Sequence, residues 1–411
     1  MKRTLITNIK SLVQVEDTAR EAVCGKDMAE VKTIENAYLL IEDDKIADFG
    51  TMDTLSENAD MTIDAKQRFV LPSFCDSHTH LVYAGSREIE YIDKIRGLSY
   101  EEIAKRGGGI LNSAKRLQEA SEDELFEDAM QRLEEIISYG TGAVEIKSGY
   151  GLTTEAELKM LRVIRRLKEA SPLTIKANFL GAHGVPLEYR GRQGDFVNLV
   201  IDEMIPQVAK ENLAEFIDVF CDTGFFTVEE TARMLEAGTK HGLVPNIHAN
   251  ELDYSGGIEV GVKYGALSVD HLECVGEKEI ATLKTSKTMP TILPGAAFFL
   301  NMPYSPARKM IEAGLPVAMA SDFNPGSSPS GNMQMVLTFA CVNYRLTPQE
   351  AINATTINSA YAMGISRTHG SIAKGKQANF YITKDIPTIE YIPYYYGTNK
   401  VERTFLNGKQ V

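Results

Sequence analysis

Two histidines placed two residues apart, His78 and His80, are the most informative feature of this 411-residue chain. They stand in the stretch FCDSHTHL, shortly after the apolar residues Phe69-Val70-Leu71. On a β-strand, residues i and i+2 point to the same side, so both imidazoles can point at one centre. Imidazole nitrogen is a common ligand of divalent cations. The spacing therefore indicates a metal site, although an H-x-H pair alone also occurs as ordinary barrel or surface histidines.

From about residue 66, the sequence alternates between apolar strand-like runs and long helical patterns. Amphipathic helices are predicted at Glu122–Tyr139, Thr154–Ala170 and Val228–His241. This alternation is typical of βα units. Eight strands fit a TIM-type (β/α)8 barrel, and hence the α/β class. The predicted strands are Phe69–His80, Ala143–Lys147, Ile175–His183, Phe216–Asp222, Val244–His248, Leu267–His271, Thr288–Leu293 and Val317–Asp322.

The polar residues at the ends of these strands form a pattern. Catalytic residues of such barrels lie at the C-terminal ends of the strands. Five of the seven histidines are predicted there: His78, His80, His183, His248 and His271. Asp322 ends the eighth strand in the same way. The remaining two histidines, His241 and His369, are interpreted as helix-end or surface residues. One face of the barrel is therefore expected to gather imidazoles and a carboxylate.

The two ends of the chain are predicted to form a second, smaller domain. Residues 1–65 alternate in short β-like runs, which favour a small antiparallel sheet. After the barrel at 66–365, residues 366–411 contain further strand-like runs that could return to the first sheet. We therefore expect a composite β-sandwich domain built from both termini.

Composition excludes several classes of protein. The net charge is −13, and no basic stripe suits nucleic acid. A small anionic substrate remains compatible, because a few local cations can hold a carboxylate. The five cysteines lack C-x-x-C spacing, which predicts reduced thiols. No signal peptide or membrane span is evident, so a cytoplasmic location is expected. The glycine run 107–109 lacks the context of a phosphate-binding loop.

The ordered ligand-type residues carry a family resemblance. His78-x-His80 after strand one, with His248, His271 and Asp322 after strands five, six and eight, resembles the amidohydrolase superfamily of metal-dependent hydrolases. Four segments are also similar to the site segments of the imidazolonepropionase family of histidine degradation, namely 145–151 (EIKSGYG), 179–184 (FLGAHG), 248–251 (HANE) and 321–327 (SDFNPGS). The resemblance implies hydrolytic ring opening of 4-imidazolone-5-propanoate to N-formimidoyl-L-glutamate.

The resemblance also implies the metal ligands, with one departure. Binuclear amidohydrolases bridge two metals with a carboxylated lysine after strand four. Here that strand ends in Phe220-Cys221-Asp222, and Lys147 follows strand two instead, as a structural or substrate-side cation. One divalent metal is therefore expected, zinc or iron, with a choice that the sequence leaves open. Its implied ligands are His78, His80, His248 and Asp322.

Catalytic roles follow from what a cyclic amide requires, because its carbonyl is weakly electrophilic and its leaving nitrogen is basic. Glu251 could accept a proton from the attacking water, or be a surface carboxylate at a helix N-terminus. His271 could polarise the carbonyl or hold the oxyanion, or be a hydrogen-bonded core histidine. Asp322 could pass the proton to the leaving nitrogen.

A propanoate tail on the substrate requires a cation and hydrogen-bond donors. From its position alone Arg87 would be read as an ordinary exposed arginine, but the resemblance implies that it pairs with the carboxylate in bidentate fashion. Tyr150 stands between glycines that permit close backbone approach. The full set of predicted substrate-binding residues is Arg87, Tyr150, His183, Glu251, Asn324, Gly326 and Ser327. The resemblance further implies a homodimer.

Two other functions remain open at this point. The same metal set serves another cyclic amidase or a ring deaminase, although Arg87 and Tyr150 argue against a neutral base as substrate. A barrel acting only as a scaffold would be expected to lose some of the ligands, and this chain retains the set.

Overall fold

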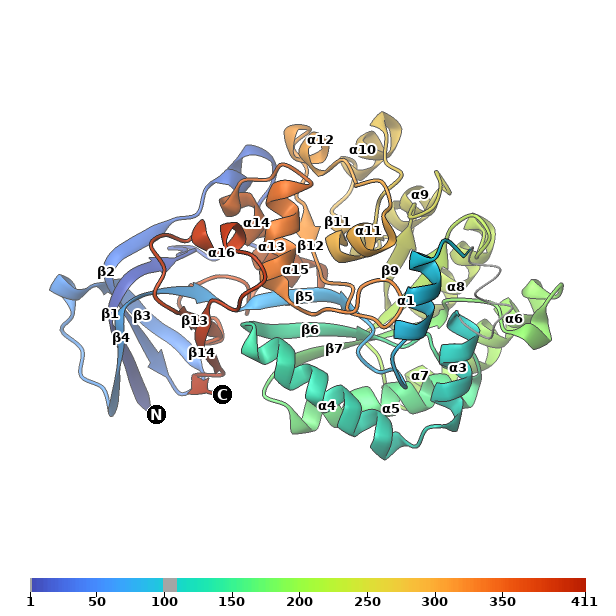
Figure 1. Cartoon of the computed structure of the whole chain (residues 1–411), viewed down its shortest axis with the longest axis horizontal. Helices are drawn as coiled ribbons and strands as arrows, with labels where there is room; N and C mark the ends of the chain where they lie inside the picture. The colour runs from blue at the N-terminus through green and yellow to red at the C-terminus, as the bar shows by residue number, and fades with distance from the viewer. Residues whose placement is uncertain (1, 99–108) are drawn as a thin grey trace.

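A computed structural model describes residues 2–98 and 109–411, and the strands of this part of the chain form two sheets (Figure 1). The larger sheet has eight strands, and each hydrogen-bonded pair in it is parallel. These strands follow one another in chain order as β5 (Phe74–Thr79), β6 (Thr141–Lys147), β7 (Thr174–Ala182), β8 (Phe216–Cys221), β9 (Val244–Ala249), β10 (Ser268–His271), β11 (Met289–Ile292) and β12 (Ala318–Met319).

The eight-stranded sheet closes on itself just beyond β12. Thr79 forms a parallel bridge with Phe323. The backbone N–H of Asp322 donates to the carbonyl of His78 at 3.0 Å, and that of His80 donates to the carbonyl of Phe323 at 2.9 Å. The predicted TIM-type barrel is confirmed, and its closure joins the first and last elements at the level of the histidines.

Helices cover the barrel, and capping residues in the sequence mark where several of them begin. Ser121 and Thr227 cap two helices through capping boxes with Glu124 and Glu230. Such caps satisfy backbone N–H groups that have no partner inside the helix. The helices are α1 (Glu88–Ile95), α3 (Ile110–Glu119), α4 (Glu122–Ser138), α5 (Thr154–Ala170), α6 (Gln193–Leu199), α7 (Ile205–Lys210), α8 (Val228–Lys240), α9 (Gly257–Lys263), α10 (Glu277–Leu283), α11 (Pro294–Leu300), α12 (Ala307–Glu312), α13 (Met333–Val342), α14 (Pro348–Thr355), α15 (Ile357–Ala362) and α16 (Tyr391–Tyr394).

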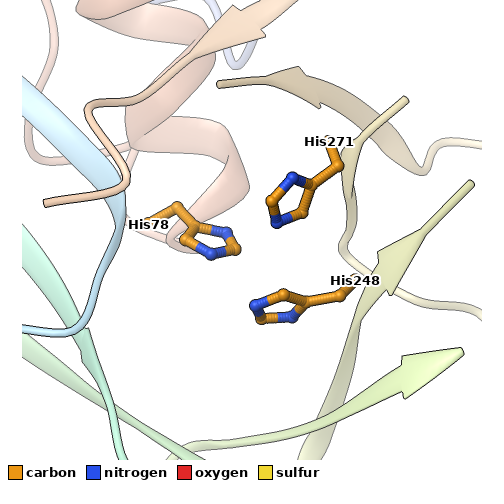
Figure 2. Close-up of side chains that lie close together, drawn as sticks. All are labelled: His78, His248 and His271. Carbon is orange, nitrogen blue, oxygen red and sulfur yellow. The ribbon is translucent and has the colours of Figure 1, made fainter. Parts of the chain in front are cut away.

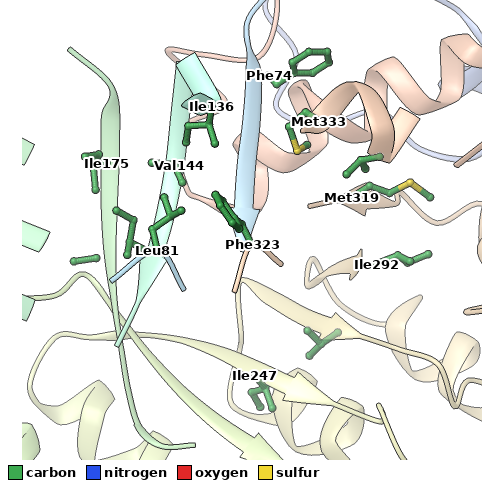
Figure 3. Packing of buried hydrophobic residues seen from close by; sticks show 14 of the residues in the cluster. Phe74, Leu81, Ile136, Val144, Ile175, Ile247, Ile292, Met319, Phe323 and Met333 are labelled. Atoms are coloured by element: carbon green, nitrogen blue, oxygen red, sulfur yellow. The ribbon is translucent and has the colours of Figure 1, made fainter. Parts of the chain in front are cut away.

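Apolar side chains of the strands pack outward against these helices. Val144 of β6 and Ile175 of β7 lie in one buried cluster with Ile136 of α4 (Figure 3). All seven residues of β6 are buried, as expected for a parallel strand covered on both faces. The charged residues within such a strand therefore point into the barrel.

The smaller sheet combines both ends of the chain, as predicted. Its strand order is β15-β14-β13-β4-β1-β2-β3. The strands are β1 (Arg3–Val13), β2 (Thr33–Glu42), β3 (Lys45–Thr51), β4 (Met61–Pro72), β13 (Phe380–Thr383), β14 (Val401–Leu406) and β15 (Lys409–Gln410). The sheet is mixed rather than purely antiparallel, because β1 and β4 run parallel.

The two ends of this sheet approach each other around a core of their own. The N–H of Ile46 in β3 donates to the carbonyl of Lys376 at 2.9 Å, just before β13. Phe380 and Phe405 stack with ring centroids 4.6 Å apart inside the enclosed cluster. The predicted composite domain is thus present beside the barrel (Figure 1).

The predicted strand Phe69–His80 is wrong as a single element, because its residues are shared between two strands of different sheets. Phe69-Val70-Leu71 belongs to β4 of the terminal sheet, and the first barrel strand begins only at Phe74. Pro72 ends β4, since proline cannot donate a backbone hydrogen bond to a neighbouring strand. The proposed division at residues 65 and 66 falls inside β4, and the domain limits stay a prediction.

Gly107 and Gly108 of the glycine run lie outside the described residues. Within the described residues, no helix has both the length and the apolar character needed to cross a membrane.

Candidate active site

His78 and His80 lie at the C-terminal end of β5, where the barrel closes. Both are buried. Nδ1 of His78 donates to Oδ2 of Asp270 at 2.6 Å, across the barrel on β10. A carboxylate on one ring nitrogen fixes the tautomer and leaves the lone pair of Nε2 free to bind a cation.

His248 at the end of β9 is held in the same manner. Its Nδ1 and its backbone N–H both donate to Oδ1 of Asp218, at 3.0 and 3.1 Å. Asp218 lies on the neighbouring strand β8 and is fully buried. His78 and His248, from distant parts of the chain, therefore each bind a carboxylate through Nδ1, and Nε2 of each ring remains without a hydrogen-bond partner among the described residues.

His271 and Asp322 complete the cluster from β10 and from the turn after β12. Ligand-type atoms of His78, His248 and His271 lie within 4.8 Å of one another, as do those of His78, His80 and Asp322. Figure 2 shows the three rings of the first group facing a common centre. His271 has φ +84° and Asp322 has φ +54°, which are uncommon for residues with side chains and frequent at functional sites.

The donor set fits a divalent cation. Nε2 of His78 and Nε2 of His248 are buried and have no hydrogen-bond partner within the described part of the chain, and Nε2 of His80 lies 3.6 Å from Oδ1 of Asp322. Burial and the surrounding positive charges lower the pKa of His78 and His80 well below the ordinary value, so both imidazoles are neutral, which is the ligating form. Neutral imidazoles with one carboxylate suit zinc or ferrous iron.

A buried cation lies beneath the histidines. Nζ of Lys147 is 2.6 Å from Glu145, 2.8 Å from Asp218 and 3.6 Å from Asp270. Burial lowers the pKa of Lys147, but the three carboxylates together raise it above its ordinary value. Lys147 is therefore the structural cation that the sequence allowed, and it holds the two aspartates that orient His78 and His248.

One cavity of 450 Å³ opens beside this cluster and brings the predicted residues together. It is lined by every predicted catalytic and substrate-binding residue, namely Arg87, Tyr150, His183, Glu251, His271, Asp322, Asn324, Gly326 and Ser327, together with His80 and His248. The site is consequently a pocket with a largely apolar lining, and at one side of it lies the metal-type cluster, which we define as His78, His80, His248, His271 and Asp322.

Comparison with known proteins decides the family. The model of the amidohydrolase family matches residues 69–411. Imidazolonepropionase of Christiangramia forsetii is 56% identical over 99% of both chains, and imidazolonepropionase of Geobacillus kaustophilus is 42% identical over 100% of this chain and 98% of its own. The chain belongs to the imidazolonepropionase family of amidohydrolases. It is therefore a hydrolase of a metal-dependent family, as the sequence predicted.

Solved structures support the fold of this amidohydrolase. A triazine hydrolase variant superposes with a TM-score of 0.75 at 16% identity, covering 99% of this chain and 94% of its own. Guanine deaminase of E. coli gives a TM-score of 0.74 at 15% identity, covering 100% and 99%. The same combination of barrel and terminal sheet therefore recurs in distant sequences.

Arg87 of the amidohydrolase enters the cavity from the start of α1. Its Nε and Nη2 donate to Oε2 of Glu90 at 2.8 and 2.5 Å. The third guanidinium nitrogen, Nη1, approaches Gly326 so closely that a Cβ on this glycine would lie 2.2 Å from it. A side chain at position 326 would therefore displace Arg87.

The turn after Asp322 is held together by Asn324. Its Oδ1 accepts from the N–H groups of Gly326 and Ser327 at 2.8 Å each, and its Nδ2 donates to the carbonyl of Asp322 at 2.7 Å. Oγ of Ser327 donates to Oδ2 of Asp322 at 3.1 Å. These residues orient Asp322, in addition to lining the cavity.

Glu251 lies in the cavity wall rather than on the surface. Burial, and secondarily the charge of Asp222, raises the pKa of Glu251 to about 8. Its Oε2 is 3.5 Å from Nδ1 of His271. A carboxyl group with a pKa near neutrality next to an imidazole is suited to proton transfer.

His183 and Tyr150 lie side by side in the cavity lining, with ring centroids 5.5 Å apart. Nδ1 of His183 donates to the carbonyl of Gly149 at 3.1 Å, and its ring stacks on His80 with centroids 5.3 Å apart. Burial lowers the pKa of His183 to about 3, so the ring is neutral. Gly149 has φ +111°, and a Cβ there would lie 3.0 Å from Nδ1 of His183.

Several residues of the site were missed from the sequence. Asp218 and Asp270 could have been noticed as lone carboxylates within otherwise apolar strands. The remaining ones, which line the cavity, carry no such signal: Lys94, Ile110, Phe220, Phe225, Leu252 and Leu300. His369 was also misplaced, because it is buried and hydrogen-bonds to Thr174 at 2.9 Å.

Proposed function

We propose that this amidohydrolase opens the ring of 4-imidazolone-5-propanoate by hydrolysis and produces N-formimidoyl-L-glutamate. One observation carries the proposal above others. A single cavity holds a metal-type cluster at one side and the cation Arg87 at another, as a cyclic amide with a carboxylate tail requires. The 56% identity to proteins named imidazolonepropionase supports the same substrate.

The proposed metal ligands are His78, His80, His248 and Asp322, with one zinc or iron ion per chain. The unpartnered buried nitrogens and the nearby carboxylate of Asp322 support this set. When bound, such a cation lowers the pKa of a water towards neutrality and polarises a carbonyl oxygen.

The side chains supply the proton transfers of the proposed reaction. Glu251 accepts a proton from the attacking water while the oxygen of this water bonds to the ring carbonyl carbon. His271 stabilises the charge that develops on the carbonyl oxygen. Asp322 then takes the remaining proton of the added water from the hydroxyl on the former carbonyl carbon and passes it to the ring nitrogen as the C–N bond breaks. This leaves a new carboxylate and a formimidoyl-bearing nitrogen, and Glu251 releases its proton to solvent. The hydrogen bond from Ser327 keeps Asp322 in place for this transfer.

Substrate orientation is assigned to the remaining cavity residues. Arg87 binds the propanoate carboxylate through its free edge near Gly326. Tyr150 and His183 contact the ring, and Asn324, Gly326 and Ser327 provide polar groups in the cavity lining.

We also propose a homodimer in the cytoplasm. The five free cysteines support a reducing compartment, and light scattering should give twice the chain mass of 45.4 kDa.

The test is loss of absorbance of freshly prepared 4-imidazolone-5-propanoate on addition of the purified protein. Rapid loss that a chelator abolishes, without release of ammonia, is expected. Turnover of aminated rings with ammonia release would instead identify a deaminase. An inert protein with full metal content would refute the proposed substrate.

A further inference from the structure

Two cations, Arg87 and Lys94, reach the cavity from the same face of α1. They are seven residues apart, which is about two helical turns. Both line the 450 Å³ cavity, and both also line an adjacent cavity of 310 Å³. In Figure 1, α1 lies beyond the arrowhead of β5, over the end of the barrel that carries the histidines. The two side chains thus form part of the wall at the mouth of the site.

The charge of Arg87 is already balanced within the protein. Two of its guanidinium nitrogens contact Glu90, and both side chains are largely buried, with exposures of 14% and 11%. A pair of this kind is neutral as a whole. Nη1 of Arg87 offers an incoming carboxylate a hydrogen-bond donor in a fixed position, but the pair of Arg87 and Glu90 contributes no net positive charge to the cavity.

Lys94 is not balanced in this way. Its Nζ donates to the carbonyl of Gly326 at 3.3 Å, and no carboxylate of the described residues forms an ion pair with it. Gly326 is the residue that Nη1 of Arg87 also approaches. Burial and the nearby charge of Arg87 lower the pKa of Lys94, which indicates that the two cations lie close together in a partly dry wall.

We propose that Lys94 is a specificity-determining residue that supplies the net positive charge by which the site selects substrates with an anionic tail. This inference rests on the proposed function, because it assumes that a carboxylate-bearing ring occupies the cavity. Before binding, Arg87 and Lys94 share one buried anion, Glu90. The other carboxylate of the described residues beside the adjacent cavity, Glu88, is exposed and accepts a hydrogen bond from Ser86, whereas Glu251 and Asp322 lie with the histidines. A substrate carboxylate near Gly326 pairs with Lys94, as Glu90 pairs with Arg87, so that both cations are then balanced by an anion.

A purely structural alternative is that Lys94 only holds α1 against the turn at Gly326. The two roles predict different losses of ligand affinity when Lys94 is replaced. A structural tie affects every ligand of the cavity, whereas a charge-selecting residue affects only ligands that carry the anionic tail.

The experiment compares Lys94→Met with Lys94→Arg, which keeps the charge, and with Arg96→Met, which removes an exposed cation at the end of the same helix. For 4-imidazolone-5-propanoate, Lys94→Met should raise KM about tenfold with kcat within a factor of three, since a charged hydrogen bond is lost. Lys94→Arg should recover most of this loss. Arg96→Met should match the unsubstituted protein.

A binding measurement separates this inference from the proposed function. Calorimetry with imidazole-4-propanoate and with 4-ethylimidazole, which has the same ring but lacks the carboxylate, uses ligands that need no turnover. Lys94→Met should weaken binding of the first about tenfold and leave the second unchanged. Equal losses for both ligands, or an unchanged affinity for imidazole-4-propanoate, would overturn the role of Lys94. Selective weakening in a protein that fails to hydrolyse 4-imidazolone-5-propanoate would support Lys94 and refute only the proposed reaction.

Discussion

Lys147 is the residue whose removal tests most directly how the metal-type cluster is supported. The substitution Lys147→Met keeps most of the side-chain length and removes the charge. In the folded protein this charge faces Glu145 at 2.6 Å, Asp218 at 2.8 Å and Asp270 at 3.6 Å, and all four side chains are buried. Without it, three carboxylates share a dry interior with no cation among them.

The expected cost follows from this burial. Removing one partner of a buried ion pair typically costs about 3–5 kcal/mol, because the remaining charge is left uncompensated. At roughly 2 °C per kcal/mol for a large domain, the melting temperature should fall by about 6–10 °C. Lys240→Met is the matched control. Lys240 pairs with Glu236 at 2.8 Å on the exposed face of α8, where such a pair contributes about 0.3–0.5 kcal/mol.

The assay is thermal melting of chelator-treated protein, so that metal binding does not contribute. In Lys147→Met the carboxylates have raised pKa values in the folded state, so the folded variant binds more protons than the unfolded chain. Its free energy of unfolding should therefore fall as pH rises from about 5 to 8, relative to the unsubstituted protein. A melting temperature within 2 °C of the Lys240→Met control would refute the role assigned to Lys147.

The other predictions concern the proposed site directly. His248→Ala should lose bound metal together with activity, and full metal content in this variant would remove His248 from the ligand set. Glu251→Gln should keep the metal and slow turnover by about 10²–10⁴-fold. Because a base acts when deprotonated and burial raises the pKa of Glu251 to about 8, activity should fall below that pH, and Glu251→Gln should lack this limb; near-normal turnover would exclude Glu251 as the base. Arg87→Ala should mainly raise KM, and an unchanged KM would exclude its carboxylate role.

Much of the fold was open to prediction from the sequence because its signals are local. Alternating apolar runs and capped helices recur along the barrel, and each is specified within one element. Ser121 with Glu124 marks the start of α4 in the sequence and in the structure. The parallel pairing of β1 with β4 was not predictable, since it depends on contacts between elements separated by the intervening hairpin.

The sequence by itself determined which residues end the barrel strands. Chain order places His78, His80, His248 and His271 at the C-terminal ends of their strands, and parallel strands bring those ends to one face. Only the tertiary structure decided how these residues are supported. Asp270 meets His78 from 192 positions away, through the register of the closed barrel rather than through any local pattern.

The same distinction holds at the mouth of the site. The sequence shows Arg87 as one cation among many, whereas the structure neutralises it with Glu90 and leaves Lys94 beside it without an ion-pair partner among the described residues. Charge balance depends on distance and burial, which periodicity does not encode. The residue types thus determine which chemistry the site can perform. The proposed selectivity for an anionic tail depends instead on which charges the fold leaves unpaired.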